Sequence, residues 1–308
     1  MSPEGPRTEQ AGPALCGILL LDKPLGLSSN AALQRVRYLL GRPKAGHTGS
    51  LDPLATGMLP LCIGEATKLA GALLAGTKGY TVRMKLGERT DTGDSEGQVI
   101  ERAPVPALDA ARIETALATL RGPQLQVPPM YSALKREGQP LYKLARQGQE
   151  VEREARSIEI HALELLEFTP DSISARVVCS KGTYVRTLSE QLGAALGSCA
   201  HVTALRRDFV EPFRGSPMVT LAQLEALEAM PPLLDADRAV SHLPALELSA
   251  SQARAIGYGQ EITSFDASPG EIRLYGPGGL FLGLGKAGPR GVVRPSRLFT
   301  AGIAGSRN

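Results

Sequence analysis

The sequence predicts an α+β fold in two parts, a larger body of strands and helices followed by a small β-rich module. Three observations support this. The chain has 308 residues, a length typical of two domains. Strand-like and helix-like segments follow one another without the regular alternation of doubly wound α/β proteins. Near residues 232–245 the sequence changes to short apolar segments separated by Gly and Pro. We therefore expect a disordered tail over residues 1–15, a body over 16–240 and a module over 241–308.

The first third of the body begins with the apolar run GILLL at residues 17–21, which predicts a buried strand. Two serines that are good N-caps open a predicted helix over residues 28–40, which stops before a glycine. Residues 42–64 are dense in Gly and Pro, so we expect mostly loop. Residues 65–75 have the apolar spacing of a further helix, again ended by a glycine.

The rest of the body contains the clearest periodic patterns. Residues 80–86 alternate between apolar and polar side chains, which predicts a half-buried strand. An acidic loop follows over residues 88–97. Residues 123–151 contain four prolines and several Lys and Arg residues, and we interpret them as a long, basic, irregular insertion. Further helices are predicted over 108–122, 184–196 and 221–230, and further strands over 157–168, 173–180 and 201–210.

Composition excludes several classes of protein. Hydrophobic residues make up 43% and charged residues 21%, as in globular domains. No apolar run reaches the roughly 18 residues of a membrane span, and the N-terminal segment has no apolar signal region. The four cysteines show no metal-binding spacing, so we expect free thiols and no metal. These features predict a cytoplasmic protein without a membrane partner.

The charge is unevenly distributed along the chain. The net charge is only +3, but residues 271–308 hold six basic residues against one acidic residue, a net +5. The remainder is therefore slightly acidic, and the basic module suits contact with phosphate groups as well as an ordinary solvated surface. Residues 283–288 match G-x-G-x-x-G. Pro289 blocks the helix that a dinucleotide site requires, so we expect a β-turn there.

The segment of residues 44–57, KAGHTGSLDPLATG, is the densest in chemically useful side chains. Asp52 precedes a proline, which holds it in extended backbone and away from a helix. For an isolated Asp-Pro, a capping role in a turn is the more common explanation. The alternative is a carboxylate displayed on a rigid loop as a nucleophile or base. No second carboxylate or Ser-His-Asp pattern accompanies it.

Six ordered blocks over about residues 17–215 strongly resemble the TruB family of tRNA pseudouridine synthases. They are GILLLDKPLGLSSN, KAGHTGSLDPLATGMLPLCIGEATKL, KGYTVRMKLGERTDTGDSEG, QVPPMYSALKREGQPLYKLARQG, CSKGTYVRTLSEQLG and AHVTALRRDFVEPF. The resemblance implies a pseudouridine synthase catalytic domain, whose mixed, largely antiparallel sheet is flanked by helices. The C-terminal tail, especially LELSASQARAIGYGQEI and GLFLGLGKAGPRGVVRPSRLF, is similar to the small β-barrel, PUA-like RNA-binding module of bacterial members, which we expect over residues 241–308.

The same resemblance implies roles for individual residues. Asp52 matches the essential catalytic aspartate, and Arg186 matches the arginine that pairs with it. Tyr80 matches the tyrosine that stacks on the target base, although by pattern alone it is an inward-facing core residue. Tyr184 and Leu205 match residues that line the pocket.

A second group of residues is implied to contact RNA. His47 matches the histidine that fills the space of the extruded base. Lys23 and Lys68 lie in matched blocks and are expected to contact phosphate or the active site. Within the insertion over 123–151 we expect RNA contacts from Met130, Tyr131, Lys135 and Arg136.

The implied activity is isomerisation of uridine to pseudouridine at position 55, in the T-loop of tRNA. Asp52 would attack C1′, abstract the C2′ proton or attack C6 of uracil, and the sequence leaves these routes open. An isomerisation needs no cofactor. The expected partner is the T-arm of tRNA, with no guide RNA and no obligate protein partner, and the chain is expected to be a monomer. The alternatives are a protein that only binds or folds RNA, a role that can also coexist with the enzyme, and a synthase with another RNA target.

Overall fold

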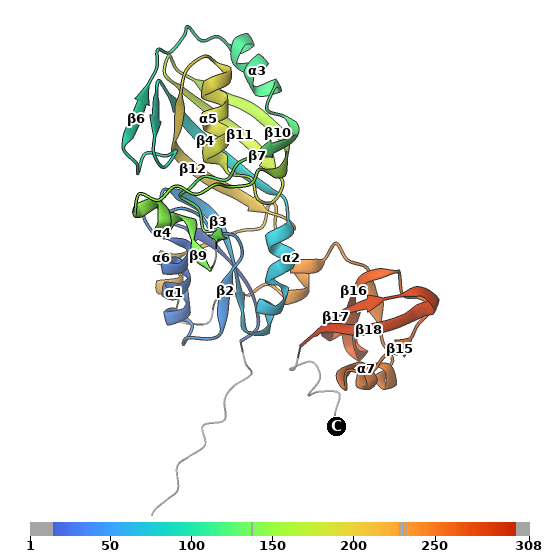
Figure 1. Cartoon of the computed structure of the whole chain (residues 1–308). Helices are drawn as coiled ribbons and strands as arrows, with labels where there is room; N and C mark the ends of the chain where they lie inside the picture. The colour runs from blue at the N-terminus through green and yellow to red at the C-terminus, as the bar shows by residue number, and fades with distance from the viewer. Residues whose placement is uncertain (1–14, 137, 228, 230, 232, 300–308) are drawn as a thin grey trace, which may run out of the picture.

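The computed structural model describes residues 15–136, 138–227, 229, 231 and 233–299. The predicted disordered tail therefore lies, apart from residue 15, outside the described residues. The body is built on a sheet of nine strands (Figure 1). Its strands are β1 (Gly17–Lys23), β2 (Ala45–His47), β3 (Ala55–Ile63), β4 (Lys78–Leu86), β7 (Gly122–Gln126), β10 (Arg156–Phe168), β11 (Ser172–Cys179), β12 (Ala200–Val210) and β13 (Val219–Thr220).

The strand order is β13-β1-β3-β12-β4-β11-β10-β7, with β2 paired to β3. The β1–β13 and β3–β12 pairs are parallel, and the other six pairs are antiparallel. The expected mixed, largely antiparallel sheet is thus confirmed. β12 and β4 form the centre of the sheet, so residues on these two strands are well placed to form the floor of a site.

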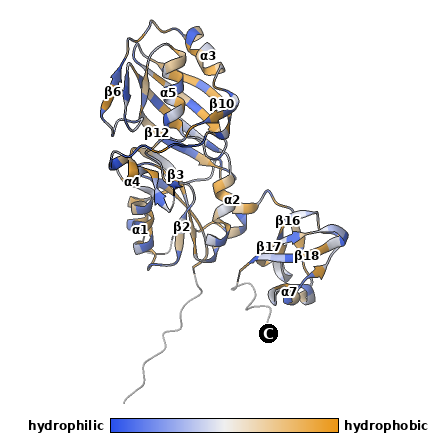
Figure 2. Ribbon diagram, viewed as in Figure 1, coloured by the Kyte–Doolittle hydropathy of each residue, from blue (hydrophilic) through white to orange (hydrophobic). Residues whose placement is uncertain are grey.

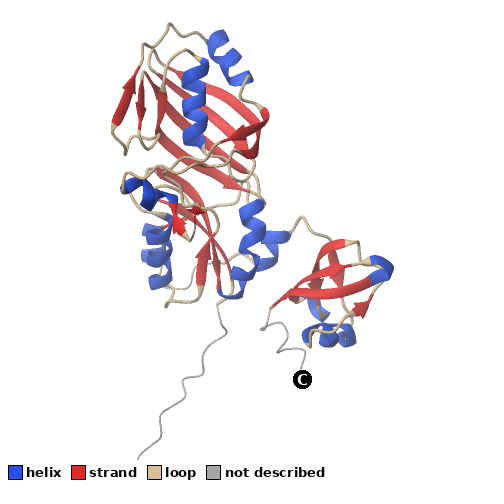
Figure 3. Cartoon of the chain, viewed as in Figure 1, coloured by secondary structure: helices blue, strands red, loops and turns tan. Residues whose placement is uncertain are grey.

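Helices pack on the sheet and close the core (Figure 3). They are α1 (Ser29–Leu39), α2 (Ala70–Ala75), α3 (Ala110–Ala118), α4 (Leu141–Arg146), α5 (Val185–Ala195) and α6 (Leu221–Glu225), with 3₁₀ segments η1 (Gly64–Leu69) and η2 (Ala236–Val240). Figure 1 shows α5 lying across the sheet. Apolar residues of α1, α3 and α5 share one buried cluster with strands β1, β3, β4, β10, β11 and β12. Burial of this apolar surface is the main source of the stability of the body.

The periodic segments of the sequence form the elements that they predict. In β4, Tyr80, Val82, Met84 and Leu86 are buried, as the alternation requires. Figure 2 shows hydrophobic and hydrophilic residues interspersed along the strands of the sheet. The helix predicted over 28–40 forms, with the Ser28 side chain accepting a hydrogen bond from the Ala31 amide.

The prediction of mostly loop over residues 42–64 was wrong, because β2 and β3 lie there. Gly57 is needed inside β3, since a Cβ at this position would lie 2.3 Å from the carbonyl oxygen of Arg207 on β12. Other boundaries also differ. The helix expected over 65–75 is a 3₁₀ segment followed by a short α-helix, and the acidic loop contains β5 (Glu88–Thr90), paired with β6 (Val99–Arg102). The insertion contains β7, α4 and the hairpin of β8 (Lys135–Arg136) and β9 (Gln139–Pro140).

The C-terminal module is a five-stranded sheet with a hydrophobic cluster of its own. It contains β14 (Ala245–Glu247), α7 (Ala250–Gly257), β15 (Ile262–Thr263), β16 (Gly270–Tyr275), β17 (Phe281–Ala287) and β18 (Val292–Leu298), in the sheet order β14-β16-β17-β18-β15. Residues 283–288, expected as a β-turn, lie mostly in β17 instead. Figure 1 shows the module beside the body, next to α2 and η2. Leu284 and Phe299 extend a buried cluster of the body.

Candidate active site

The loop between β2 and β3 carries Asp52 and is held in place from α1. The Leu51 amide donates to Ser29 Oγ (2.6 Å), and the Ser29 hydroxyl donates back to the Leu51 carbonyl (3.0 Å). On the other side of Asp52, the Pro53 carbonyl accepts from the Gly26 amide (2.9 Å). The loop is thus fixed on both sides of Asp52, and the carboxylate is displayed on a rigid support.

Arg186, in the first turn of α5, joins Asp52 to a second carboxylate. Its guanidinium lies 3.0 Å from Asp52 Oδ2 and 3.6 Å from Asp94 Oδ2. It also donates to the carbonyls of Thr92 (2.8 Å) and Tyr131 (2.6 Å). Arg186 is only 6% exposed. Two carbonyls and two carboxylates from three segments hold its guanidinium in place. We call Asp52, Arg186 and Asp94 the buried triad.

Asp52 lines a pocket of about 370 Å³. The floor comes from β4 and β12, one wall from the start of α5, and another wall from residues 132–134 of the insertion. Its lining includes the predicted residues Asp52, Tyr80, Tyr184, Arg186 and Leu205. The structure therefore brings all the residues that were expected to perform or support chemistry to one cavity.

Burial raises the pKa of the Asp52 carboxyl above its ordinary value. Asp94 raises it further, whereas the positive charges of Arg186 and Lys23 lower it. The side chain of Asp52 remains 42% exposed, toward the pocket. A carboxylate that is both accessible and poorly solvated is a stronger base and nucleophile than one at the surface.

The two tyrosines of the pocket have different surroundings. Tyr80 is a buried residue of β4, and burial raises the pKa of its hydroxyl, while the charge and hydrogen bond of Arg207 lower it. Tyr184 precedes α5, where its amide donates to Gln126 Oε1 (2.7 Å) and its carbonyl accepts from Gln126 Nε2 (3.2 Å). Burial also raises the pKa of Tyr184, and the charge of Arg186 opposes this increase. Both tyrosines line the cavity.

Sequence reasoning missed Asp94, Lys78 and Arg207. Asp94 is 2% exposed and lies in TDTGDSEG, a segment read as an acidic loop and as part of a motif block, but with no role assigned to Asp94. Lys78 and Arg207 line the pocket. Both positions could have been predicted from the alternation of side chains along a strand. Lys78 is two residues before Tyr80 and Arg207 is two residues after Leu205, so each lies on the same face of its strand as a predicted pocket residue.

Lys23 is fully buried beside the pocket and donates to the carbonyls of Pro24 (2.9 Å) and Leu27 (2.6 Å). Burial lowers its pKa to about 8, although Asp52 raises it. His47 lies in β2, outside the pocket lining, and its buried Nδ1 has no hydrogen-bond partner among the described residues. Burial and Arg207 lower the pKa of His47.

The remaining predicted RNA contacts are spread over two regions. Lys68 lies where the module meets the body, and its Nζ contacts Glu65 (2.6 Å) and the Leu298 carbonyl (2.6 Å). Lys135 and Arg136 are exposed on β8 and line a separate cavity. Met130 and Tyr131 lie in the insertion, where the carbonyl of Tyr131 binds Arg186. The RNA contacts of all these residues stay predictions.

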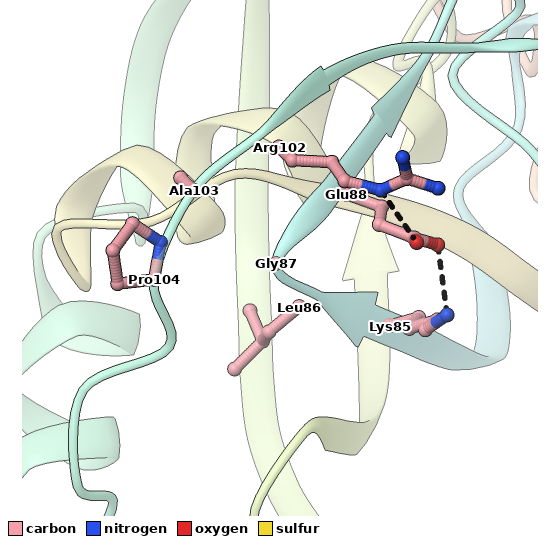
Figure 4. A pocket seen from close by; sticks show the side chains of 7 residues that line it. All are labelled: Lys85, Leu86, Gly87, Glu88, Arg102, Ala103 and Pro104. Atoms are coloured by element: carbon pink, nitrogen blue, oxygen red, sulfur yellow. Dashed lines mark hydrogen bonds and ion pairs between the residues drawn. The ribbon is translucent and has the colours of Figure 1, made fainter.

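A different surface pocket, of about 410 Å³, lies at the base of the β5–β6 hairpin (Figure 4). Glu88 lies there between Lys85 (2.8 Å) and Arg102 (3.3 Å), as Figure 4 shows, and we call these three residues the surface triad.

Among the described residues, no group of three or more His, Cys, Asp or Glu side chains could hold a metal ion. No helix within the described part of the chain is both long and apolar enough to cross a membrane.

Solved structures share this fold. The structure titled as a Cbf5-Nop10-Gar1 complex is 25% identical, with a TM-score of 0.66 over 88% of this chain and 78% of that chain. The Nop10-Cbf5 complex of the archaeal box H/ACA sRNP is 24% identical, with a TM-score of 0.67 over 92% of this chain and 85% of that chain. The body therefore has the pseudouridine synthase fold.

Sequence relatives cover most of the chain. The model of the TruB family pseudouridylate synthase N-terminal domain matches residues 37–185, and two TruB C-terminal models match 186–238 and 244–299. The protein named tRNA pseudouridine synthase B of Aromatoleum aromaticum is 53% identical, over 92% of this chain and 92% of that relative. Its namesake from Stutzerimonas stutzeri is 52% identical, over 92% of this chain and 95% of that relative. The chain therefore belongs to the TruB family of pseudouridylate synthases.

Proposed function

We propose that this protein isomerises uridine to pseudouridine in tRNA, at position 55 of the T-loop. The ion pair of 3.0 Å between Asp52 and the buried Arg186, at the wall of a pocket lined by two tyrosines, carries the proposal. Relatives that are about half identical and named tRNA pseudouridine synthase B support the substrate class. The position within tRNA rests on the resemblance of the motif blocks.

Pseudouridine formation breaks the N1–C1′ bond, turns the uracil and joins C5 to C1′, while C5 loses its proton and N1 gains one. Atoms and electrons balance without an oxidant or an energy source. Asp52 is the group that attacks or takes a proton, and Arg186 keeps it ionised despite its burial. The attack on C1′, the abstraction at C2′ and the attack on C6 all require the same ionised carboxylate.

The target base has to leave the RNA stack to reach Asp52. The rings of Tyr80 and Tyr184 at the pocket support stacking on the extruded uracil. His47, close to the loop of Asp52, would occupy the vacated space in the RNA. The exposed Lys135 and Arg136 of the insertion would contact phosphates, and this predicts that affinity falls as salt rises.

The C-terminal module is proposed to be a PUA-like RNA-binding module. Its small five-stranded sheet and its share of the basic residues support this. We propose that the protein acts on the T-arm as a cytoplasmic monomer, without a guide RNA. A monomer corresponds to a mass of 32.5 kDa, which mass photometry or sedimentation with and without tRNA would measure.

The direct test incubates the protein with an unmodified tRNA transcript and maps pseudouridine by chemical labelling. We expect modification at position 55 with the native protein and none with Asp52→Asn, which still binds tRNA. Asp208→Asn is a matched control, because Asp208 bonds Thr81 (2.8 Å) and does not line the pocket. Absence of pseudouridine in the T-loop would overturn the proposal. Rescue of tRNA folding by Asp52→Asn would show an additional folding role.

A further inference from the structure

Arg207 on β12 is a charged residue of the pocket to which the reaction as described gives no role. It is 1% exposed and is among the largest fully buried side chains of the protein. It nevertheless lines the same cavity as Asp52 and Tyr80. Arginine is rarely buried to this extent without a carboxylate partner, because its charge loses the solvation of water.

Two hydrogen bonds connect Arg207 to both ends of the segment that carries Asp52. Its Nε donates to the carbonyl of Met58 (2.7 Å), and its Nη2 donates to the carbonyl of Gly49 (3.0 Å). Gly49 lies before Asp52 and Met58 lies after it, so one guanidinium spans the base of the catalytic loop. The planar guanidinium suits this task, because its nitrogens point in fixed directions.

Arg207 is also aligned with Tyr80. The two residues are direct partners in the antiparallel pair of β12 and β4, so their side chains leave the sheet on the same face. The guanidinium acts on the Tyr80 hydroxyl through its charge and through a side-chain hydrogen bond. Arg207 therefore contacts the Asp52 loop on one side and Tyr80 on the other.

The charge of Arg207 is not neutralised locally. Among the residues that the structure describes, no carboxylate forms an ion pair with it, and Tyr80 is the partner that supports its charge. The preceding residue behaves differently, because Arg206 forms a bidentate pair with Asp22 (3.0 and 2.8 Å) and is partly exposed. The positive field of Arg207 thus acts on Tyr80 and the pocket.

We propose that Arg207 is a positioning residue that fixes the Asp52 loop and the Tyr80 hydroxyl in one arrangement, so that the hydroxyl stabilises negative charge on the uracil. This inference rests on the proposed function. When the N1–C1′ bond breaks, its electron pair stays on the uracil, while C1′ bonds to an Asp52 oxygen or the C2′ proton moves to Asp52. A hydroxyl beside a cation is a stronger hydrogen-bond donor to such an anion.

The test compares Arg207→Met and Arg207→Lys with Arg206→Met and Arg206→Lys. The single-turnover rate of Arg207→Met should fall about 100-fold, comparable to the loss of one preorganised donor. Its Kd for tRNA should stay within about twofold of the native value, and Arg207→Lys should recover part of the rate. Both Arg206 variants should react at the native rate, because Arg206 does not line the pocket.

A spectroscopic measurement isolates the contact with Tyr80. With 3-fluorotyrosine at position 80, the ¹⁹F titration should move to higher pH in Arg207→Met and remain unchanged in Arg206→Met. A folded Arg207→Met protein with the native rate, or with an unchanged ¹⁹F titration, would overturn the proposal. If circular dichroism shows that Arg207→Met is unfolded, the single-turnover rate and the ¹⁹F titration of Arg207→Lys test the proposal instead. The ¹⁹F titration needs no RNA, so it tests the contact between Arg207 and Tyr80 even if the protein does not form pseudouridine.

Discussion

Two triads of charged residues show how differently the same groups behave in two regions of the molecule. In the buried triad, Arg186 lies between the carboxylates of Asp52 and Asp94. In the surface triad, Glu88 lies between the cations of Lys85 and Arg102 (Figure 4). Both triads border cavities of similar volume. The two triads differ in the burial of the partners, because Arg186 and Asp94 are almost fully buried, whereas Lys85 and Arg102 are 40% and 74% exposed.

The two environments shift the pKa of a carboxyl in opposite directions. Hydrogen bonds from Lys85 and Arg102 lower the pKa of Glu88 and outweigh the opposing effect of desolvation. Burial raises the pKa of Asp52 despite its ion pair with Arg186. An ion pair alone therefore does not fix the direction of a carboxyl's pKa shift, which depends on the balance between its charged partners and its desolvation.

The largest effect is expected from Arg186→Ala. Asp52 would lose its nearest cation and remain in a poorly solvated site, so less of it would be ionised. We expect a loss of at least about 1000-fold in the single-turnover rate of pseudouridine formation, with the fold retained by circular dichroism. Arg102→Ala in the surface triad is the matched control and should react at the native rate. Native activity of Arg186→Ala would refute the role of the buried triad.

Asp94→Asn should have a smaller effect, of about 10- to 100-fold in the rate. Asp94 accepts hydrogen bonds from the Thr92 hydroxyl (2.6 Å) and the Glu96 amide (3.1 Å), and it shares Arg186 with Asp52. Asparagine keeps the shape but weakens its hold on Arg186. The measurement is the single-turnover rate beside the Kd for tRNA. Weaker binding of tRNA with an unchanged single-turnover rate would assign Asp94 to RNA binding instead.

The pH dependence gives a finer comparison. Because the pKa of Asp52 is raised, activity should disappear on acidification at a higher pH than expected for an ordinary aspartate, whose pKa is about 3.9. Asp94 contributes to the increase, so Asp94→Asn should move this acidic limb to lower pH, whereas Glu88→Gln should leave it in place. Rate profiles on tRNA from pH 4 to 8 would measure both. An acidic limb of Asp94→Asn at higher pH than the native one would contradict this account.

Much of the fold and of the site was predictable where local patterns decide the structure. The alternation in residues 80–86 indicated the burial of Tyr80, and the serine cap indicated the start of α1. The resemblance of the motif blocks singled out Asp52 and Arg186, whose side chains lie 3.0 Å apart in the structure. β3 was missed because Gly57 and Pro60 disfavour a strand locally, and its place between β1 and β12 depends on pairing with distant segments.

The missed site residues depend on the same long-range pairing. From the sequence alone, an acidic loop is expected to be exposed to solvent. Asp94 is buried through its contacts with Arg186 and β12, which are distant in the sequence. Lys78 and Arg207 are basic residues in strands, and a surface position is the usual expectation for them. Their place at the pocket follows from the register of β4 and β12, which joins residues more than 100 positions apart.

The smallest effect is expected from Glu88→Gln, which breaks both ion pairs of the surface triad. Exposed ion pairs contribute little and are screened by salt, so any decrease in unfolding temperature should disappear at about 1 M salt, where the Debye length is about 3 Å. Pseudouridine formation should be unaffected. Thermal unfolding at low and high salt, beside the rate on tRNA, measures both. A decrease that persists in salt, or a loss of rate, would mean that the surface triad has a structural or functional role like that of the buried one.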